Sequence, residues 1–163
     1  LMTNLQKAKI CRGEHMFSST HFLPDMGKCE RLHGHNYQVE VELGGIPAKN
    51  GAIIDFNDLV PIVTRVVRPL DHYIIIASKD TRLTIIESES EVEIQFKDNR
   101  YIFPKNNCVM LPIKQTTVES LSKYLANRIG EVLIKSYPNI HWIDVLVREG
   151  QVQSASTKVL LKE

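Results

Sequence analysis

The chain has 163 residues, 43% hydrophobic and 24% charged, a balance typical of a folded domain that argues against intrinsic disorder. The net charge is +1 and the Lys and Arg residues are scattered, so no basic stripe indicates a nucleic-acid partner. No apolar run approaches the roughly 18 residues of a membrane span, and three widely spaced cysteines favour a reducing compartment over a disulfide framework. We therefore expect one domain, residues 1–163, in the cytoplasm, with neither nucleic acid nor membrane as a partner.

The first clear element is a strand over residues 35–43, which Gly44 and the following turn residues end. Its apolar and polar side chains alternate, as a half-buried antiparallel strand requires. A helix follows, because apolar residues recur at three- and four-residue spacing from Val60 to Leu70. Asp58 is the expected N-cap, which puts Pro61 in the first turn.

Residues 77–112 are less regular and contain a predicted hairpin, with strands 91–96 and 101–103 joined at a turn at Asp98-Asn99. The pattern Thr116-Thr117-Val118-Glu119 is a capping box, and it predicts a second helix that ends before Pro138. Two closing strands, 143–147 and 151–161, are expected to join at Glu149-Gly150. This order of elements predicts an α+β domain with an antiparallel sheet.

Three histidines form the most informative pattern. His33 and His35 are two residues apart in a predicted strand, so both imidazoles point to one side, and Gly34 removes bulk from the other side. His21 would complete a set of three nitrogens with one open position, the arrangement typical of catalytic zinc. An isolated His-x-His is also common by chance, and most histidines only form hydrogen bonds, so the spacing by itself does not name a reaction.

Other candidate residues each have a structural alternative. Cys29 could be an ordinary buried thiol, and Asp71-His72 could simply end the first helix, with His72 near the negative end of the dipole. Glu149 could be a plain hairpin residue. Glu119 is assigned to the capping box.

At these positions the sequence resembles the family of 6-pyruvoyl-tetrahydropterin and 6-carboxy-tetrahydropterin synthases. Several motifs in order carry the resemblance: Phe17–Pro24, Cys29–Tyr37, Ala52–Phe56, Leu70–Tyr73, Thr116–Leu121 and Val147–Glu149. The resemblance implies a tunnelling fold, a four-stranded antiparallel sheet with two helices on one face, with an inserted hairpin at about 77–112. It also implies a homo-oligomer, a trimer or a hexamer, with active sites at subunit boundaries.

The resemblance further implies roles for these residues. His21, His33 and His35 match the ligands of Zn²⁺, which would polarise substrate oxygens. Cys29 matches the catalytic cysteine and Asp71-His72 the acid–base pair. Glu149 matches the carboxylate that accepts hydrogen bonds from the pterin ring, and Thr117 is a further candidate pterin contact.

The spacing Cys-x-x-x-His-Gly-His from Cys29 to His35 resembles the 6-carboxy-tetrahydropterin enzymes. The expected reaction converts 7,8-dihydroneopterin triphosphate to 6-carboxy-5,6,7,8-tetrahydropterin, acetaldehyde and triphosphate, a step towards queuosine or archaeosine. Two alternatives stay open: a 6-pyruvoyl-tetrahydropterin synthase that uses the same substrate, and a protein of this fold that binds a pterin or purine without converting it.

Overall fold

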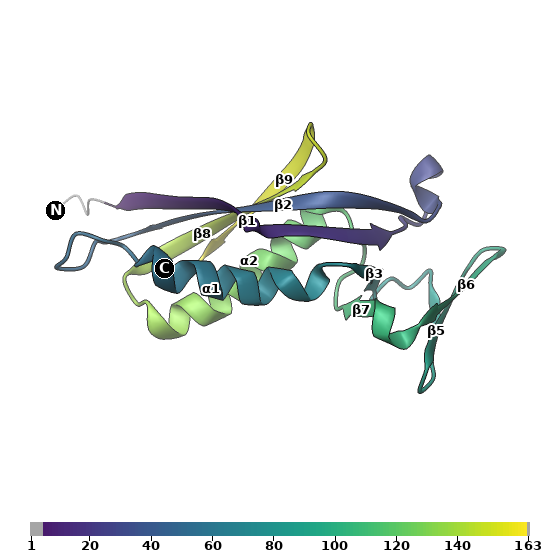
Figure 1. Cartoon of the computed structure of the whole chain (residues 1–163). Coiled ribbons are helices and arrows are strands. Elements are labelled where there is room, and N and C mark those ends of the chain that lie inside the picture. Colours follow the sequence, from purple (N-terminus) through teal and green to yellow (C-terminus); the bar gives the residue numbers. More distant parts are fainter. Residues whose placement is uncertain (1–4, 163) are drawn as a thin grey trace.

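The computed structural model describes residues 5–162. Its main feature is a six-stranded sheet with the strand order β7-β3-β1-β2-β8-β9. Two helices, α1 and α2, lie on one face of this sheet (Figure 1). The sheet strands and helices have these bounds: β1 Gln6–His21, β2 His33–Gly45, α1 Phe56–Val67, β3 Tyr73–Ala77, β7 Cys108–Leu111, α2 Val118–Ser136, β8 Ile140–Glu149 and β9 Gln153–Leu160. Short 3-10 turns are η1 Gly27–Glu30, η2 Arg68–Leu70 and η3 Lys105–Asn107.

The expectation of a four-stranded antiparallel sheet was wrong. Strands β1, β2, β8 and β9 do pair antiparallel, but β3 pairs parallel with β1, and β7 pairs parallel with β3. The sheet is therefore mixed. The two added strands have only five and four residues, and their side chains form a continuous apolar run rather than an alternating pattern.

The main core lies between the sheet and the two helices. Along β2 the side chains of Tyr37, Val39, Val41 and Leu43 are fully buried, as the alternation predicts. They pack in one cluster with apolar residues of α1, α2 and β8. His33 and His35 continue this inward-facing row at the start of β2, so the histidines emerge from the core side of the sheet.

The N-cap of helix α1 lies three residues before the predicted one. Asp55, not Asp58, is the N-cap, and its carboxylate accepts a hydrogen bond of 2.8 Å from the Asn57 N–H. Pro61 therefore lies inside the helix rather than in its first turn. The helix ends at Val67 and continues as η2, because Pro69 cannot extend the α-helical hydrogen bonding.

Helix α2 is capped one residue later than the capping-box pattern predicts. The Thr117 hydroxyl accepts from the Ser120 N–H, while Thr116 faces the histidines. Glu119 therefore lies one position too early in the helix for the reciprocal bond of a capping box. The helix itself is present, and its buried stripe includes Leu121, Leu125, Ile129 and Leu133.

A second sheet of three antiparallel strands, the accessory sheet, lies between β3 and β7 in the sequence. It consists of β4 (Thr84–Glu87), β5 (Glu91–Phe96) and β6 (Asn99–Pro104). The predicted β5–β6 hairpin is confirmed, although the turn is Lys97-Asp98, because Asn99 already pairs with Phe96. Val92, Ile94 and Phe96 form a small core of their own with Phe22 and Ile76. No helix within residues 5–162 is long and apolar enough to cross a membrane.

Candidate metal centre and active site

Strands β1 and β2 bring the three predicted histidines together. His21 pairs with His33 across the two strands, and Ser19 pairs with His35. The ring centroids are 4.7 Å apart for His21 and His33, 5.3 Å for His21 and His35, and 5.0 Å for His33 and His35. One ring nitrogen from each histidine lies within 4.8 Å of the others. This cluster can hold a metal ion.

Two of the imidazoles are held by main-chain carbonyls. The Nδ1 of His21 lies 3.1 Å from the Thr116 carbonyl oxygen and 3.0 Å from the Thr116 hydroxyl. The Nδ1 of His33 lies 2.6 Å from the Arg31 carbonyl oxygen. A carbonyl can only accept, so Nδ1 carries the proton in both rings and Nε2 keeps its lone pair. Such contacts are typical of metal-ligating histidines, because they fix the tautomer and the ring orientation.

The third imidazole has a buried nitrogen without a hydrogen bond. The Nε2 of His35 lies 3.1 Å from Glu149 Oε1, but the two groups are not oriented to form a hydrogen bond. Buried polar atoms without partners are rare in folded proteins and call for an explanation. A metal ion bound by the three histidines would supply the missing partner.

The electrostatics also suit a metal. Burial, followed by the neighbouring His33 and His35, lowers the pKa of His21 from 6.5 to about 4. Burial lowers the pKa of His35 as well, although the nearby Glu149 carboxylate opposes this shift. Both rings are therefore neutral near pH 7, the state in which an imidazole nitrogen can bind a metal. The cluster has three nitrogens, and within residues 5–162 no fourth ligand atom is grouped with them, so the geometry matches an open, catalytic type of centre.

A cavity of about 560 Å³ adjoins the histidines. Cys29 from η1, His33 and His35 from β2, and Glu149 from β8 all line it. Glu149 reaches this place because it pairs with Tyr37, two residues after His35 on the same face of β2. The cavity thus combines a thiol, a carboxylate and two histidines of the cluster. The remaining lining residues are Lys28, Arg31, Leu32 and Gln153.

Asp71 and His72 meet each other but do not line this cavity. His72 has a φ of +64°, and this left-handed bend brings its Nδ1 to 3.0 Å from Asp71 Oδ2. The other carboxylate oxygen of Asp71 accepts a hydrogen bond of 2.8 Å from the Ser18 N–H, which lowers the pKa of Asp71. The His72 side chain is 82% exposed. The pair is therefore an ordered Asp–His unit that points into solvent.

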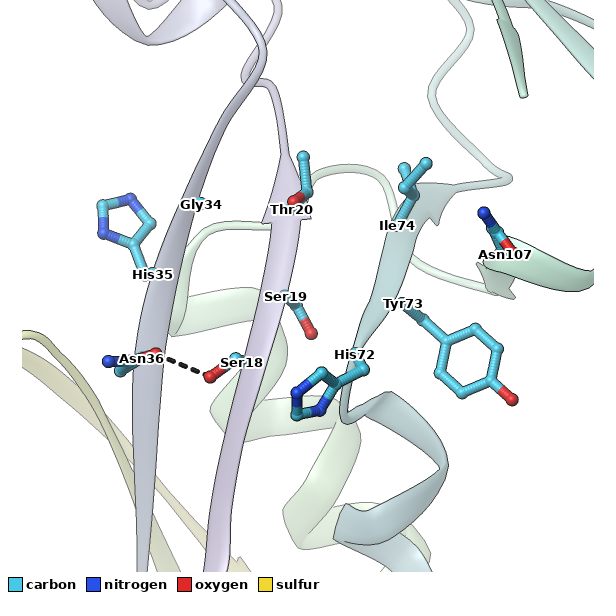
Figure 2. A pocket seen from close by; sticks show the side chains of 10 residues that line it. All are labelled: Ser18, Ser19, Thr20, Gly34, His35, Asn36, His72, Tyr73, Ile74 and Asn107. Carbon is cyan, nitrogen blue, oxygen red and sulfur yellow. Dashed lines mark hydrogen bonds between the residues drawn. The ribbon is translucent and has the colours of Figure 1, made fainter. Parts of the chain in front are cut away.

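His72 belongs to a second cavity, of about 500 Å³. Figure 2 shows that the His72 and His35 rings lie on opposite sides of the strand pair in this view. Ser18, Thr20 and Asn36 line this cavity, and their side chains point to the opposite face of their strands from the histidines. His35 lines it as well, so the two cavities have one residue in common. A Cβ atom at Gly34 would lie only 3.1 Å from the Ser19 carbonyl oxygen, so glycine suits the close approach of β1 and β2 there.

The two neighbouring threonines at the start of α2 differ in their contacts. Thr117 caps the helix and is absent from the residues that line the Cys29 cavity. Thr116 is buried and holds His21, a contact that the sequence analysis did not identify. The sequence analysis assigned Thr116 only to the capping box.

The chain is similar to known proteins over most of its length. Residues 10–158 match the family model described as 6-pyruvoyl tetrahydropterin synthase. A protein of Methanocaldococcus jannaschii with the provisional name 6-carboxy-5,6,7,8-tetrahydropterin synthase is 31% identical over 148 residues, which are 90% of this chain and 91% of the relative. The 6-carboxy-5,6,7,8-tetrahydropterin synthase of Haemophilus influenzae is 35% identical over 122 residues, 71% of this chain and 78% of the relative.

A crystal structure of 6-pyruvoyl tetrahydropterin synthase from Plasmodium vivax is similar, with a TM-score of 0.88 and 30% identity over 96% of this chain and 99% of that one. Two further structures of the Plasmodium vivax enzyme carry alanine or cysteine in place of a glutamate described as a catalytic residue. The family match covers most of the chain, and the His cluster lies within it. This protein therefore belongs to the 6-pyruvoyl tetrahydropterin synthase family and is a lyase of the tetrahydropterin synthase type.

Proposed function

We propose that the protein converts 7,8-dihydroneopterin triphosphate and water to 6-carboxy-5,6,7,8-tetrahydropterin, acetaldehyde and triphosphate, with zinc bound by His21, His33 and His35. The observation that carries this proposal is the cavity lined by Cys29, Glu149 and two histidines of the cluster, His33 and His35. The names of the relatives from Methanocaldococcus jannaschii and Haemophilus influenzae support the carboxy product. Such a product would enter the synthesis of queuosine or archaeosine.

Each group in the cavity has a chemical task in this proposal. A bound zinc ion supplies a Lewis acid that polarises hydroxyl and carbonyl oxygens of the substrate side chain. Glu149 accepts hydrogen bonds from the parallel N–H donors of the pterin ring and so orients it. Cys29 removes and returns a proton at the side-chain carbons that become acidic beside the polarised oxygens. Thr117 stays a predicted pterin contact. Its hydroxyl already accepts a hydrogen bond from the Ser120 N–H at the start of α2, which does not favour this role.

Two cations at the rim are candidates for the triphosphate. Lys28 and Arg31 line the cavity on either side of Cys29 and Glu30 in the sequence. Arginine and lysine are the usual partners of phosphate oxygens. Nothing in the sequence spacing selects these two residues, and their common cavity with Cys29 is the reason to assign them.

The position of Asp71 and His72 supports a homo-oligomeric active site. The two residues form an acid–base unit, yet neither lines the Cys29 cavity, and His72 lines a different one. We propose that a second copy of the chain presents its Asp71–His72 pair to the Cys29 cavity, within a trimer or hexamer. A cytoplasmic setting would suit the three free cysteines.

A specific observation favours a second candidate, the 6-pyruvoyl product. The similar Plasmodium vivax enzyme has that name and uses a catalytic glutamate. This chain carries a carboxylate, Glu30, directly after Cys29. Both reactions use the same substrate, so the product and the group that moves the proton have to be identified together.

The decisive experiment is mass spectrometry of the products formed from 7,8-dihydroneopterin triphosphate by zinc-loaded protein. We expect a 6-carboxy-tetrahydropterin and acetaldehyde, loss of turnover on chelation, and recovery on zinc addition. Cys29→Ala should abolish turnover and retain substrate binding, whereas Glu30→Gln should lower turnover far less than Cys29→Ala. A 6-pyruvoyl product would establish the second candidate. Unchanged substrate from the zinc-loaded protein would overturn both.

A further inference from the structure

The segment that carries Cys29 is packed only at its start, where Phe22 and Leu23 are buried. It leaves β1 after His21, forms η1 over Gly27–Glu30 and enters β2 at His33, and η1 contains no buried residue. Its main-chain bonds are internal, such as the 2.8 Å bond from the Leu23 N–H to the Cys29 carbonyl. Side chains from other parts of the fold must therefore fix the position of η1 relative to the cavity.

Lys97, in the turn of the accessory sheet, supplies two of these contacts. Its ammonium group lies 2.7 Å from Glu30 Oε1 and 3.1 Å from Asp25 Oδ1. Glu30 Oε1 also accepts a 2.9 Å hydrogen bond from the Asp25 N–H, which closes the segment into a loop. Both carboxylates thus meet one cation, and Glu30 is the residue next to Cys29. Figure 1 shows η1 above the accessory sheet at the same end of the molecule.

Arg82, just before the accessory sheet, supplies further contacts. Its Nη1 donates to the Pro24 carbonyl at 2.9 Å and to Asp25 Oδ2 at 3.0 Å. Its other nitrogens form a bidentate pair with the buried carboxylate of Asp80, at 2.8 and 2.7 Å. The guanidinium is therefore held rigidly before it reaches the loop. Gln115 adds a 3.0 Å bond to the same Pro24 carbonyl.

We propose that Lys97 and Arg82 are positioning residues, which use the accessory sheet to hold the Cys29 loop against the metal-binding cavity. This inference rests on the proposed function of Cys29. Exposed ion pairs add little to overall stability, so stability alone does not explain the convergence of two cations on two carboxylates that flank Cys29. A reacting group displaced by about 1 Å can lose on the order of 100-fold in rate. We call the contacts of Lys97 and Arg82 with this loop the clamp. Loss of the clamp should therefore lower the rate of the chemical step.

Lys97→Met is the variant that tests the clamp. Arg82 is less suitable, because its removal would leave the buried Asp80 carboxylate without its partner. Lys97→Arg keeps the charge and should retain most of the function. Lys105→Met is the matched control, since it breaks an exposed ion pair with Glu87 in the same region without touching the loop.

Two measurements on the zinc-loaded protein separate this inference from the proposed function. Amide hydrogen exchange of Leu23, Asp25 and Cys29 should become about ten-fold faster in Lys97→Met, because their hydrogen bonds lie within the clamped loop. The turnover number should fall about ten-fold, with unchanged KM and zinc content, because the displaced thiol reacts more slowly. Lys97→Arg should restore both values, and Lys105→Met should change neither.

Unchanged loop exchange in Lys97→Met would overturn the clamp, whatever the activity. A turnover number equal to that of Lys105→Met, with faster loop exchange, would overturn the positioning role. If the unmodified protein does not convert the substrate, the proposed function fails, and the exchange data still decide whether Lys97 holds the loop.

Discussion

Thr116 determines how His21 faces the other two histidines. Its carbonyl oxygen and hydroxyl both lie near 3 Å from His21 Nδ1, at 3.1 and 3.0 Å. The carbonyl alone fixes the tautomer, and the hydroxyl adds a second restraint on the ring. The threonine would therefore affect a bound metal through its contact with His21 and not by contact with the metal.

Thr116→Val removes the hydroxyl and keeps the carbonyl. We expect zinc to bind about ten-fold more weakly, the lower end of the range for loss of such a supporting contact. Competition with a chromophoric chelator measures this. Thr117→Val is the control, because it should lower the free energy of unfolding by about 1 kcal/mol through the lost N-cap and leave zinc affinity unchanged. Equal zinc affinity in both variants would contradict the assignment.

His21 also makes the stability of the metal-free protein depend on pH. Burial and the neighbouring histidines lower its pKa in the folded state from 6.5 to about 4. As the pH falls from 6.5 towards 4, the unfolded chain takes up the proton first, so the free energy of unfolding decreases. The expected slope is at most about 1.4 kcal/mol per pH unit for this one proton, and the lowered pKa of His35 adds to it.

Urea denaturation in the presence of a chelator, at several pH values between 7.5 and 4.5, measures that slope. It should be smaller in His21→Asn, because the titrating group is gone. A profile of the metal-free protein that is flat between pH 6.5 and 4.5 would show that the folded protein accepts these protons freely.

The sequence predicted those candidate site residues whose relative positions depend on their spacing within one strand. His33 and His35 are two residues apart in a strand, so their common face follows from the period of the strand. Thr116 and Lys97 could not be found in this way, because they reach the site from segments far away in the sequence. The left-handed backbone conformation of His72 could not be predicted from the sequence either, because residues other than glycine rarely adopt it.

Among the elements, β2 and β8 make an unusually close contact at Gly44. It pairs with Trp142, and a Cβ atom added to Gly44 would lie 2.2 Å from the Trp142 ring. Gly44→Ala should therefore lower the free energy of unfolding by about 1–3 kcal/mol, because the indole must move within a packed environment. Gly13→Ala is the control, since nothing lies within 4 Å of its added Cβ. Thermal unfolding compares the two, and equal stabilities would contradict the close contact.

The sequence predicted well those strands in which apolar and polar residues alternate and those helices that carry an apolar stripe. The periodicity identified β2, α2 and the β5–β6 hairpin, with limits that differ by a few residues. It missed β1 as a strand over Gln6–His21, because its first half is mostly exposed and a register shift between Cys11 and Met16 breaks the alternation. The short strands β3 and β7 are set by pairing with distant partners, which periodicity does not report.

For the whole molecule, a mixing experiment tests the composite active site. Cys29→Ala and His72→Ala should each be inactive. Mixed at equal amounts, dissociated and reassembled, they should regain about a quarter of the activity, because one interface in four combines an intact Cys29 with an intact His72 of a neighbour. Mixtures that are never dissociated serve as the control. No recovery, with mixed oligomers present, would mean that both residues act within one chain or that His72 has no role.

The accessory sheet has a consequence for how the chain folds. Strands β3 and β7 are parallel, so the chain must travel back along their length before β7 can pair, and the accessory sheet occupies this return path. Its strands are joined by short local hairpins, which form on the microsecond scale, and hairpin formation shortens the loop that β7 must close. Local collapse of β4–β6 should thus precede docking of β7. Until that moment β3 exposes a free apolar edge, the point at which a nascent chain would be most open to aggregation.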